Sequence, residues 1–147
     1  MSLEFLLDSN VLSEPLRSRP NSRVMERLVR YERKIATSTT VWQELLFGCE
    51  RLPQSRKRQQ IETYLASKVL TKIPILPYDF QAATWHAQER SRLVSMGRTP
   101  AFADSQIAAV AKVNNLILVT NNVSDYENFA NLQIQNWFLD EPRIELL

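Results

Sequence analysis

Short apolar runs alternate with longer stretches of helical periodicity along the whole chain. Four runs are short enough for buried strands and a weaker fifth follows them, at residues 5–7, 35–37, 73–76, 116–119 and 132–135. The stretches between them space their apolar residues as amphipathic helices do, at residues 11–16, 21–33, 40–51, 54–70, 79–95 and 100–113. Strands that alternate with helices are typical of a parallel sheet. We therefore predict an α/β domain with a mostly parallel central sheet of four or five short strands, flanked by helices.

Polar residues and helix breakers set the expected ends of several elements. Thr40 and Gln43 have the spacing of a capping box, which predicts a helix that begins there. Gly97 and Pro100 separate the last two helices. Pro74 has no N–H group to donate, so it interrupts the third strand.

Nothing in the pattern divides the chain into smaller units. Its 147 residues have about the length of one ordinary domain and contain no repeat or long linker, so residues 1–147 are expected to form a single domain. No apolar run approaches the roughly 18 residues of a membrane span. The first residues lack a basic segment and a cleavage site, and a single cysteine fits a reducing compartment. We expect a soluble cytoplasmic protein without membrane contacts.

The scarcity of three residue types excludes several kinds of site. The chain has two glycines, Gly48 and Gly97, which are too few for dinucleotide fingerprints, Walker loops and nucleophile elbows. One cysteine (Cys49) and one histidine (His86) exclude a disulfide framework and a Cys/His zinc site. We expect Cys49 to be buried and His86 to lie on a helix surface. Any chemistry done by side chains then falls to carboxylates.

Four acidic residues lie where a parallel α/β sheet places its ligands, beyond the carboxyl ends of its strands. Asp8 directly follows the first strand, Glu44 lies in the first turns after the second, and Asp125 follows the fourth by a short loop. Each of these also fits a structural role, as a helix cap or as a solvated residue near a helix start. Asp104 differs, because it shares a helix face with small apolar residues, where an unpartnered carboxylate is costly: Ala101, Ala108 and Ala111.

Together the four acids indicate a metal site. Two carboxylates about 5 Å apart repel each other by roughly 3 kcal/mol at an effective dielectric constant near 20. Oxygen ligands without histidine or thiol favour a hard ion, Mg²⁺ or Mn²⁺. Nearby polar residues are expected to orient the carboxylates or bound water: Ser9, Asn10, Thr120 and Asn122. Such a site suits the hydrolysis of phosphate esters by metal-activated water.

These residues resemble the motifs of the PIN-domain ribonucleases. The matching features are Asp8-Ser9-Asn10 after a strand, a helical Glu44, Asp104 followed by Ser105-Gln106-Ile107-Ala108-Ala109, and residues 120–126 with the sequence Thr-Asn-Asn-Val-Ser-Asp-Tyr. Length and motif order resemble the VapC-type toxins of bacterial toxin–antitoxin pairs, including the FitB branch. The resemblance covers about residues 3 to 138, and it implies a Mg²⁺-dependent endoribonuclease with catalytic and metal-binding residues Asp8, Glu44, Asp104 and Asp125.

The resemblance also implies partners. It implies a cognate antitoxin that blocks the active site, a homodimer that joins a larger complex with the antitoxin, and contact with operator DNA only through the antitoxin. Transfer RNA or a ribosomal RNA loop is the implied substrate. The chain departs from the family in two places: Ser9 stands where the family usually has Thr, and the acidic position of Asp125 varies within the family.

Basic residues are concentrated in the larger part of the chain. Residues 1–98 carry sixteen Lys and Arg against ten Asp and Glu, whereas residues 99–147 carry two against six. One helix face groups several of them at helical spacing, and a further arginine precedes Asp104. We expect contacts to RNA or a partner, or simply a solvated face, at Arg23, Arg27, Arg30, Lys34 and Arg98.

Three other functions remain to be weighed against the nuclease. A haloacid-dehalogenase-type phosphatase needs a second Asp two residues after the first, where this chain has Asn10. A receiver domain needs paired acids before its phospho-acceptor strand, and Glu4 is the only acid before Asp8. A catalytically silent scaffold or co-repressor would bind antitoxin and nucleic acid without cutting, and the presence of all four acids argues against it.

Overall fold

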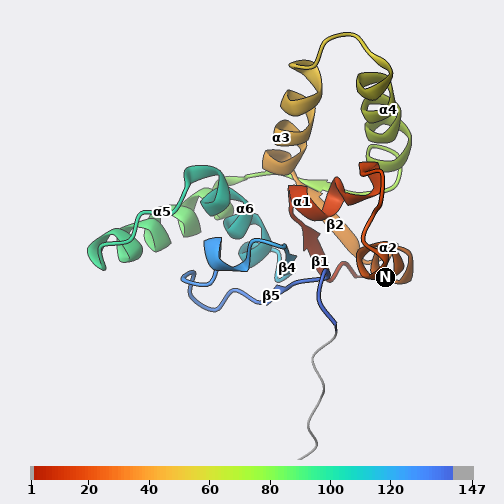
Figure 1. Ribbon diagram of the computed structural model, residues 1–147. Helices are drawn as coiled ribbons and strands as arrows, with labels where there is room; N and C mark the ends of the chain where they lie inside the picture. Colours follow the sequence, from red (N-terminus) through yellow and green to blue (C-terminus); the bar gives the residue numbers. More distant parts are fainter. Residues whose placement is uncertain (1, 141–147) are drawn as a thin grey trace, which may run out of the picture.

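The computed structural model describes residues 2–140, and in it five parallel strands form one central sheet (Figure 1). The order across the sheet is β3-β2-β1-β4-β5, so the first strand lies at the centre. The strands are β1 (Phe5–Leu7), β2 (Ile35–Ser38), β3 (Ile75–Leu76), β4 (Ile117–Val119) and β5 (Ile134–Gln135). The prediction of an α/β domain around a parallel sheet is confirmed.

Helical segments connect the strands and cover the sheet. The helices are α1 (Ser9–Leu12), α2 (Ser22–Arg30), α3 (Thr39–Glu50), α4 (Arg56–Tyr64), α5 (Phe80–Ser95) and α6 (Phe102–Val113). Shorter helical turns are η1 (Glu14–Leu16), the π-helical η2 (Leu65–Val69) and η3 (Val123–Asp125). Figure 1 shows α3 and α4 standing out together from one end of the sheet, while α5 extends to the left and α6 lies between α5 and the strands. Within residues 2–140 no helix has the length and apolarity to cross a membrane.

The core is built on the three central strands. All residues of β1 are buried, and Leu6 and Leu118 are fully inaccessible to solvent on adjacent strands. Small residues on α6 let this helix approach the sheet closely, since Ala108 and Ala111 are also fully buried. At 25–30 cal/mol for each Å² of buried apolar surface, these contacts are the main source of stability. The sheet is therefore a rigid base for whatever lies at its ends.

The register of the sheet aligns the ends of β1 and β4. Leu7 pairs with Val119, and the N–H group of Asp8 donates to the carbonyl of Val119 at 3.0 Å. Because all strands are parallel, their carboxyl ends lie at one edge, where α3 also begins directly after β2. The helix α6 precedes β4, and its last turn leads into the amino end of that strand. The first turn of α6 therefore lies at the carboxyl edge of the sheet. This edge collects residues from four separate stretches of the chain.

Several expected element boundaries differ from the structure: α2 ends at Arg30 rather than near residue 33, and β5 begins at Ile134 rather than at residue 132. Thr40 does not cap α3: Ser38 does, by accepting from the N–H group of Val41, while the Thr40 hydroxyl donates to Gln106. The helix expected over residues 54–70 is α4 followed by the π-helical turn η2, and β3 keeps only the two residues after Pro74. A proline lacks the N–H group of a strand ladder, so the strand at this sheet edge is short.

The single histidine is buried, which corrects the expectation of a surface position. Its Nδ1 lies 2.7 Å from the hydroxyl of Tyr78, and its ring packs 4.8 Å from that of Phe102. Burial and the nearby Arg90 lower the pKa of His86, so the imidazole is neutral at neutral pH. His86 is part of the packing between α5 and α6. Cys49 is buried, as predicted.

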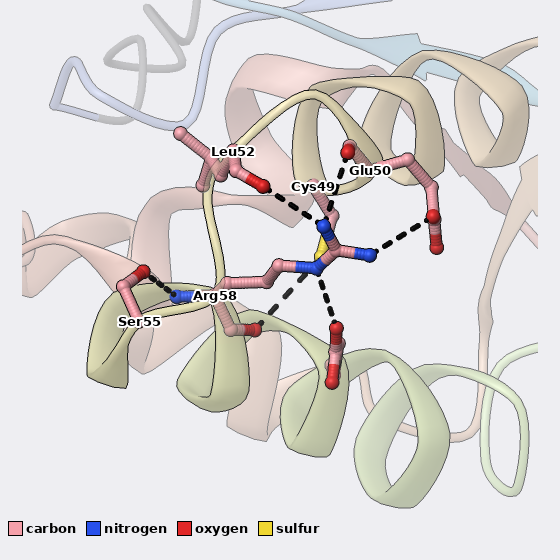
Figure 2. A network of polar contacts seen from close by, with 6 residues as sticks. Cys49, Glu50, Leu52, Ser55 and Arg58 are labelled. Carbon is pink, nitrogen blue, oxygen red and sulfur yellow. Dashed lines mark hydrogen bonds and ion pairs between the residues drawn. The ribbon is translucent and has the colours of Figure 1, made fainter.

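One arginine joins α3 to α4. Figure 2 shows the Arg58 guanidinium donating to the carbonyl of Leu52 at 2.8 Å and to the carboxylate of Glu50 at 3.0 Å. It also donates to Glu62, one turn further along α4, at 2.8 Å. The network fixes the turn between the two helices, so the outer end of α3 is held by α4 while its inner end is held by the sheet.

The central strand makes a direct test of the fold. Replacing the fully buried Leu6 by Ala leaves a cavity at the centre of the sheet, so we expect the free energy of unfolding to fall by about 2–5 kcal/mol. Urea denaturation followed by circular dichroism measures this loss. The exposed Phe80 is the control, and Phe80→Ala should change stability by no more than about 0.5 kcal/mol. Equal losses in the two variants would contradict the fold.

Candidate active site

Asp8 is held at the end of β1 by four hydrogen-bond donors. The N–H group of Ser9 donates to Oδ1 at 2.8 Å. The hydroxyls of Thr120 and Tyr126 donate to Oδ2 at 2.8 and 3.1 Å, and the Asn10 amide donates to the same oxygen at 3.3 Å. With 3% of its surface exposed, Asp8 is a buried carboxylate with a fixed orientation. Such an arrangement goes beyond a simple helix cap, although Asp8 also caps α1.

The loop after β4 is tied to the start of α1. Asn10 donates to the Thr120 hydroxyl at 3.2 Å and accepts from the N–H group of Asn121 at 2.8 Å. The N–H group of Asn122 donates to the same hydroxyl at 3.0 Å. The four polar residues predicted to orient the carboxylates therefore lie around Asp8. Asn10 and Thr120 contact it through their side chains and Ser9 through its backbone N–H group, while the backbone N–H group of Asn122 contacts Thr120. Together they fix the loop that carries Asp125.

Asp104 faces Asp8 from the first turn of α6. Its carboxylate is half-buried, and the Tyr126 hydroxyl lies 3.3 Å from its Oδ1. Burial is the main cause that raises the pKa of Asp104, followed by the negative charges of Asp125 and Asp8, while the hydrogen bond from Tyr126 opposes the rise. Of the small apolar face expected around Asp104, Ala108 and Ala111 are buried, whereas Ala101 is exposed.

Glu44 reaches the same site from α3. Its Oε1 is buried and has no hydrogen-bond partner among the described residues. Burial raises the pKa of Glu44, and the negative charges of Asp8 and Asp104 raise it further. An unpartnered buried carboxylate oxygen is costly unless a cation or a proton satisfies it. Glu44 is therefore the acid of the site whose buried charge is least satisfied by the described residues.

Asp125 lies at the rim of the site. It is exposed at the end of η3, and its charge contributes to the raised pKa of Asp104. Asp104, Asp125 and Arg98 line one cavity of about 350 Å³, with Leu93 and Phe129 among its apolar neighbours. Four acids from separate stretches thus meet at one edge of the sheet, three of them partly or fully buried and one exposed.

Tyr126 belongs to the site and was missed by the sequence analysis. Its hydroxyl touches both Asp8 and Asp104, and its side chain is buried. Burial, then the charges of Asp8 and Asp104, raise the pKa of Tyr126 well above its ordinary value, so the phenol keeps its proton. The signal in the sequence is its place at the end of the matched motif, directly after Asp125, where an aromatic residue is equally expected as core.

The basic residues of α2, with Lys34 after its end, do not form an open cationic face. Arg27 is buried and donates to the carbonyl of Leu139 at 2.7 Å, which contradicts the exposure that an RNA contact requires. The long side chain lies under the segment after β5 because its alkyl part packs while its guanidinium finds a carbonyl. The other three each pair with an acid, in the ion pairs Arg23–Asp140, Arg30–Glu26 and Lys34–Glu4. Arg98 alone of the predicted contacts lines the acidic cavity.

The chemistry of this site fits a hard divalent cation. Its donors are carboxylate oxygens, one of them buried without a partner, and burial followed by mutual repulsion raises the pKa of both Glu44 and Asp104. Among residues 2–140 no three acidic, histidine or cysteine side chains form a ready-made ligand set. Mg²⁺ usually binds one or two carboxylates directly and keeps several waters, so it does not require three acids in contact. A bound cation would relieve both the repulsion and the unpartnered oxygen.

Comparison with known proteins places this geometry in context. The PIN domain model matches residues 5–131, a stretch that contains all four acids. The chain is 34% identical to the tRNA(fMet)-specific endonuclease VapC of Shigella flexneri, over 92% of this chain and 98% of that protein. It is also 34% identical to toxin FitB of Neisseria gonorrhoeae, over 82% of this chain and 89% of that protein. The structure of FitAB bound to a DNA fragment matches with a TM-score of 0.86 and 30% identity, over 94% of this chain and 98% of that one.

The crowded acids predict an unusual dependence of stability on pH. Because Glu44 and Asp104 have raised pKa values, the folded chain binds more protons than the unfolded chain above about pH 4. Stability from these groups is therefore present at low pH and is lost as pH rises through their raised pKa values. Asp104→Asn removes one charge and keeps an acceptor for Tyr126. In EDTA at pH 7 we expect this variant to unfold at a higher temperature than the wild type, by roughly 2–4 °C for each kcal/mol gained.

Calorimetric scans in EDTA between pH 4 and pH 8 measure this effect. The gain should shrink as the pH falls toward 4, because the wild-type carboxyl, whose pKa is raised, takes up a proton. The control variant is Glu32→Gln, which makes the same chemical change at an exposed position outside the site. A lower unfolding temperature for Asp104→Asn at pH 7 would mean that the carboxylate is stabilised by its surroundings rather than crowded.

Proposed function

This chain belongs to the PIN-domain family and has VapC and FitB relatives over most of its length, and from that premise we propose that it is the endoribonuclease toxin of a toxin–antitoxin pair. The observation that carries the proposal is that Asp8, Glu44 and Asp104 lie close together, with Asp125 at the rim. The Glu44 Oε1 is buried there and has no hydrogen-bond partner among the described residues. Residues 1–147 form one domain in this proposal.

The proposed cofactor is Mg²⁺, with Mn²⁺ as an alternative of similar chemistry. Asp8, Glu44 and Asp104 would hold it, directly or through water, and Asp125 would complete the acidic set. When bound, the ion supplies a water that is more easily deprotonated and neutralises charge that develops on the phosphate. The protein holds its carboxylates in place beforehand, through the hydrogen bonds from Ser9 and Thr120 to Asp8.

One side chain of the site can accept the proton that the attacking water loses during hydrolysis. The Glu44 Oε1 has no hydrogen-bond partner within residues 2–140, so it is the acceptor for a proton from the attacking water. The water oxygen bonds to phosphorus while the bond to the 3′ oxygen breaks; the 3′ oxygen takes up a proton from solvent water, and the other product carries a 5′-phosphate. No 2′-hydroxyl nucleophile is needed. Glu44 combines a raised pKa with burial, the combination that suits a general base.

The RNA backbone is proposed to pass over the cavity beside Asp104. Arg98 lies on its lining, exposed and close in the chain to the acids, and it supplies the positive charge that a phosphate requires. The relative from Shigella flexneri is named for tRNA(fMet), which makes initiator tRNA the first substrate to test and a ribosomal RNA loop the second.

The proposed protein partner is a cognate antitoxin. The FitAB structure was solved on a DNA fragment, and the neighbouring complexes pair such toxins with antitoxins. We propose that this chain likewise forms a homodimer within a larger complex, which reaches operator DNA through the antitoxin. Three exposed aromatic side chains are available for such contacts. They are Phe47, Phe80 and Phe102.

Cleavage of RNA tests the proposed activity. The purified, antitoxin-free chain should cleave initiator tRNA in Mg²⁺ and stop in EDTA, and Asp8→Asn should lower the rate by roughly 100-fold or more because the site loses its best-anchored carboxylate. Gel assays of 5′-labelled RNA measure the rate, and Glu32→Gln is the control for removing a surface charge. Equal cleavage in all samples would indicate a contaminating nuclease. No cleavage of tRNA or ribosomal RNA, together with antitoxin binding, would favour the silent scaffold.

A second variant tests the path of the RNA. Arg98→Gln should raise KM for RNA by roughly 3- to 10-fold and leave kcat within about twofold, because a phosphate contact contributes to binding and not to bond breaking. The salt dependence of binding should also weaken. Arg33→Gln is the matched control, since Arg33 is exposed just before β2, at the other end of the strand from the acids. The same rise in KM for both variants would remove Arg98 from the site.

A further inference from the structure

One hydroxyl group connects the two acids that come from opposite sides of the site. The Tyr126 hydroxyl lies 3.1 Å from Asp8 Oδ2 and 3.3 Å from Asp104 Oδ1. Asp8 follows β1 and Asp104 lies in α6, so only contacts between separate elements fix their relative placement. The tyrosine comes from a third element, the segment that follows η3.

The position of this hydroxyl is itself fixed. Tyr126 is 1% exposed, and its ring packs against that of Phe129 with centroids 6.2 Å apart. Its N–H group donates to the carbonyl of Val123 at 3.0 Å, which closes the helical turn that bears Asp125. A buried ring on a closed turn has little rotational freedom, so the hydroxyl has a fixed position between the carboxylates.

The two oxygens of Asp8 have different hydrogen-bond partners. Three donors lie within hydrogen-bond distance of Oδ2, the Tyr126 and Thr120 hydroxyls and the Asn10 amide, so its two lone pairs are fully used, and the one proton of Tyr126 serves either Asp8 or Asp104 at any moment. Among residues 2–140 Oδ1 accepts only from the N–H group of Ser9 and keeps a lone pair for a cation. Losing the tyrosine hydroxyl would therefore remove one donor beside Asp8 and the one group that contacts both Asp8 and Asp104 among the hydrogen bonds of the described residues.

We propose that Tyr126 is a positioning residue, which holds Asp8 and Asp104 in the mutual orientation that a divalent ion requires and thereby sets the affinity of the site for that ion. The inference rests on the proposed function, because it concerns the same metal site. Tyr126 touches the carboxylates rather than the ion or the RNA, so its loss is felt first in metal binding and only through it in cleavage.

Tyr126→Phe removes the hydroxyl and keeps the ring. Isothermal calorimetry with MgCl₂, and the rise of the unfolding temperature with Mg²⁺ concentration, measure affinity without any RNA. We expect the variant to bind Mg²⁺ roughly 10- to 100-fold more weakly than the wild type, the usual range when a group that orients a ligand is removed. Cleavage should then need correspondingly more Mg²⁺ and should reach a kcat close to the wild-type value at saturation.

Tyr64→Phe is the matched control. The Tyr64 hydroxyl is also largely buried, but it donates to the carbonyl of Leu12 at 2.5 Å and touches no acid of the site. Its loss should lower stability and leave Mg²⁺ affinity unchanged, which separates positioning from a general loss of packing.

Different results overturn different parts of the account. If the wild type binds Mg²⁺ and cleaves RNA while Tyr126→Phe binds with the same or higher affinity, the role of Tyr126 is wrong and the nuclease stands. A variant that loses kcat at saturating Mg²⁺ with unchanged affinity contradicts the positioning role as well. If the wild type neither binds Mg²⁺ nor cleaves RNA, the proposed function itself fails.

Discussion

Repulsion between carboxylates at one edge of the sheet is the constraint on which the account depends. Asp8 satisfies its charge with four donors, whereas Glu44 keeps a buried oxygen without a partner and Asp104 faces two other acids. A protein free to optimise stability alone would replace such groups by neutral ones, because buried unpaired charge is expensive. The fold keeps them together, and a shared cation is the simplest way to satisfy them all.

The topology of the sheet explains how distant residues come to share this edge. Pairing of Leu7 with Val119 brings Asp8 beside Thr120, although 112 positions separate them in sequence. Parallel order then places the start of α3 and the first turn of α6 nearby, each with one acid. The site is thus built on strands and helices anchored in the core, which limits how far the carboxylates can relax apart.

Most of the fold was predictable because burial and period leave strong marks in sequence. The strands and the carboxyl edge follow from short apolar runs, and Asp8 follows from its place after one of them. The choice between neighbouring residues for the same role was harder to predict. Ser38, not Thr40, caps α3, and Arg27 is buried with its guanidinium bonded to the Leu139 carbonyl after β5. The role of Tyr126 could not be predicted, because contacts between elements decide whether a tyrosine is core or part of a site.

Diffraction from crystals soaked in MnCl₂ tests the central claim most directly, because anomalous scattering locates manganese independently of any assumed chemistry. The account predicts one strong peak within coordination distance, direct or through water, of Asp8, Glu44 and Asp104. Manganese bound only elsewhere, with the Glu44 carboxylate satisfied by a protein donor or turned to solvent, would contradict it.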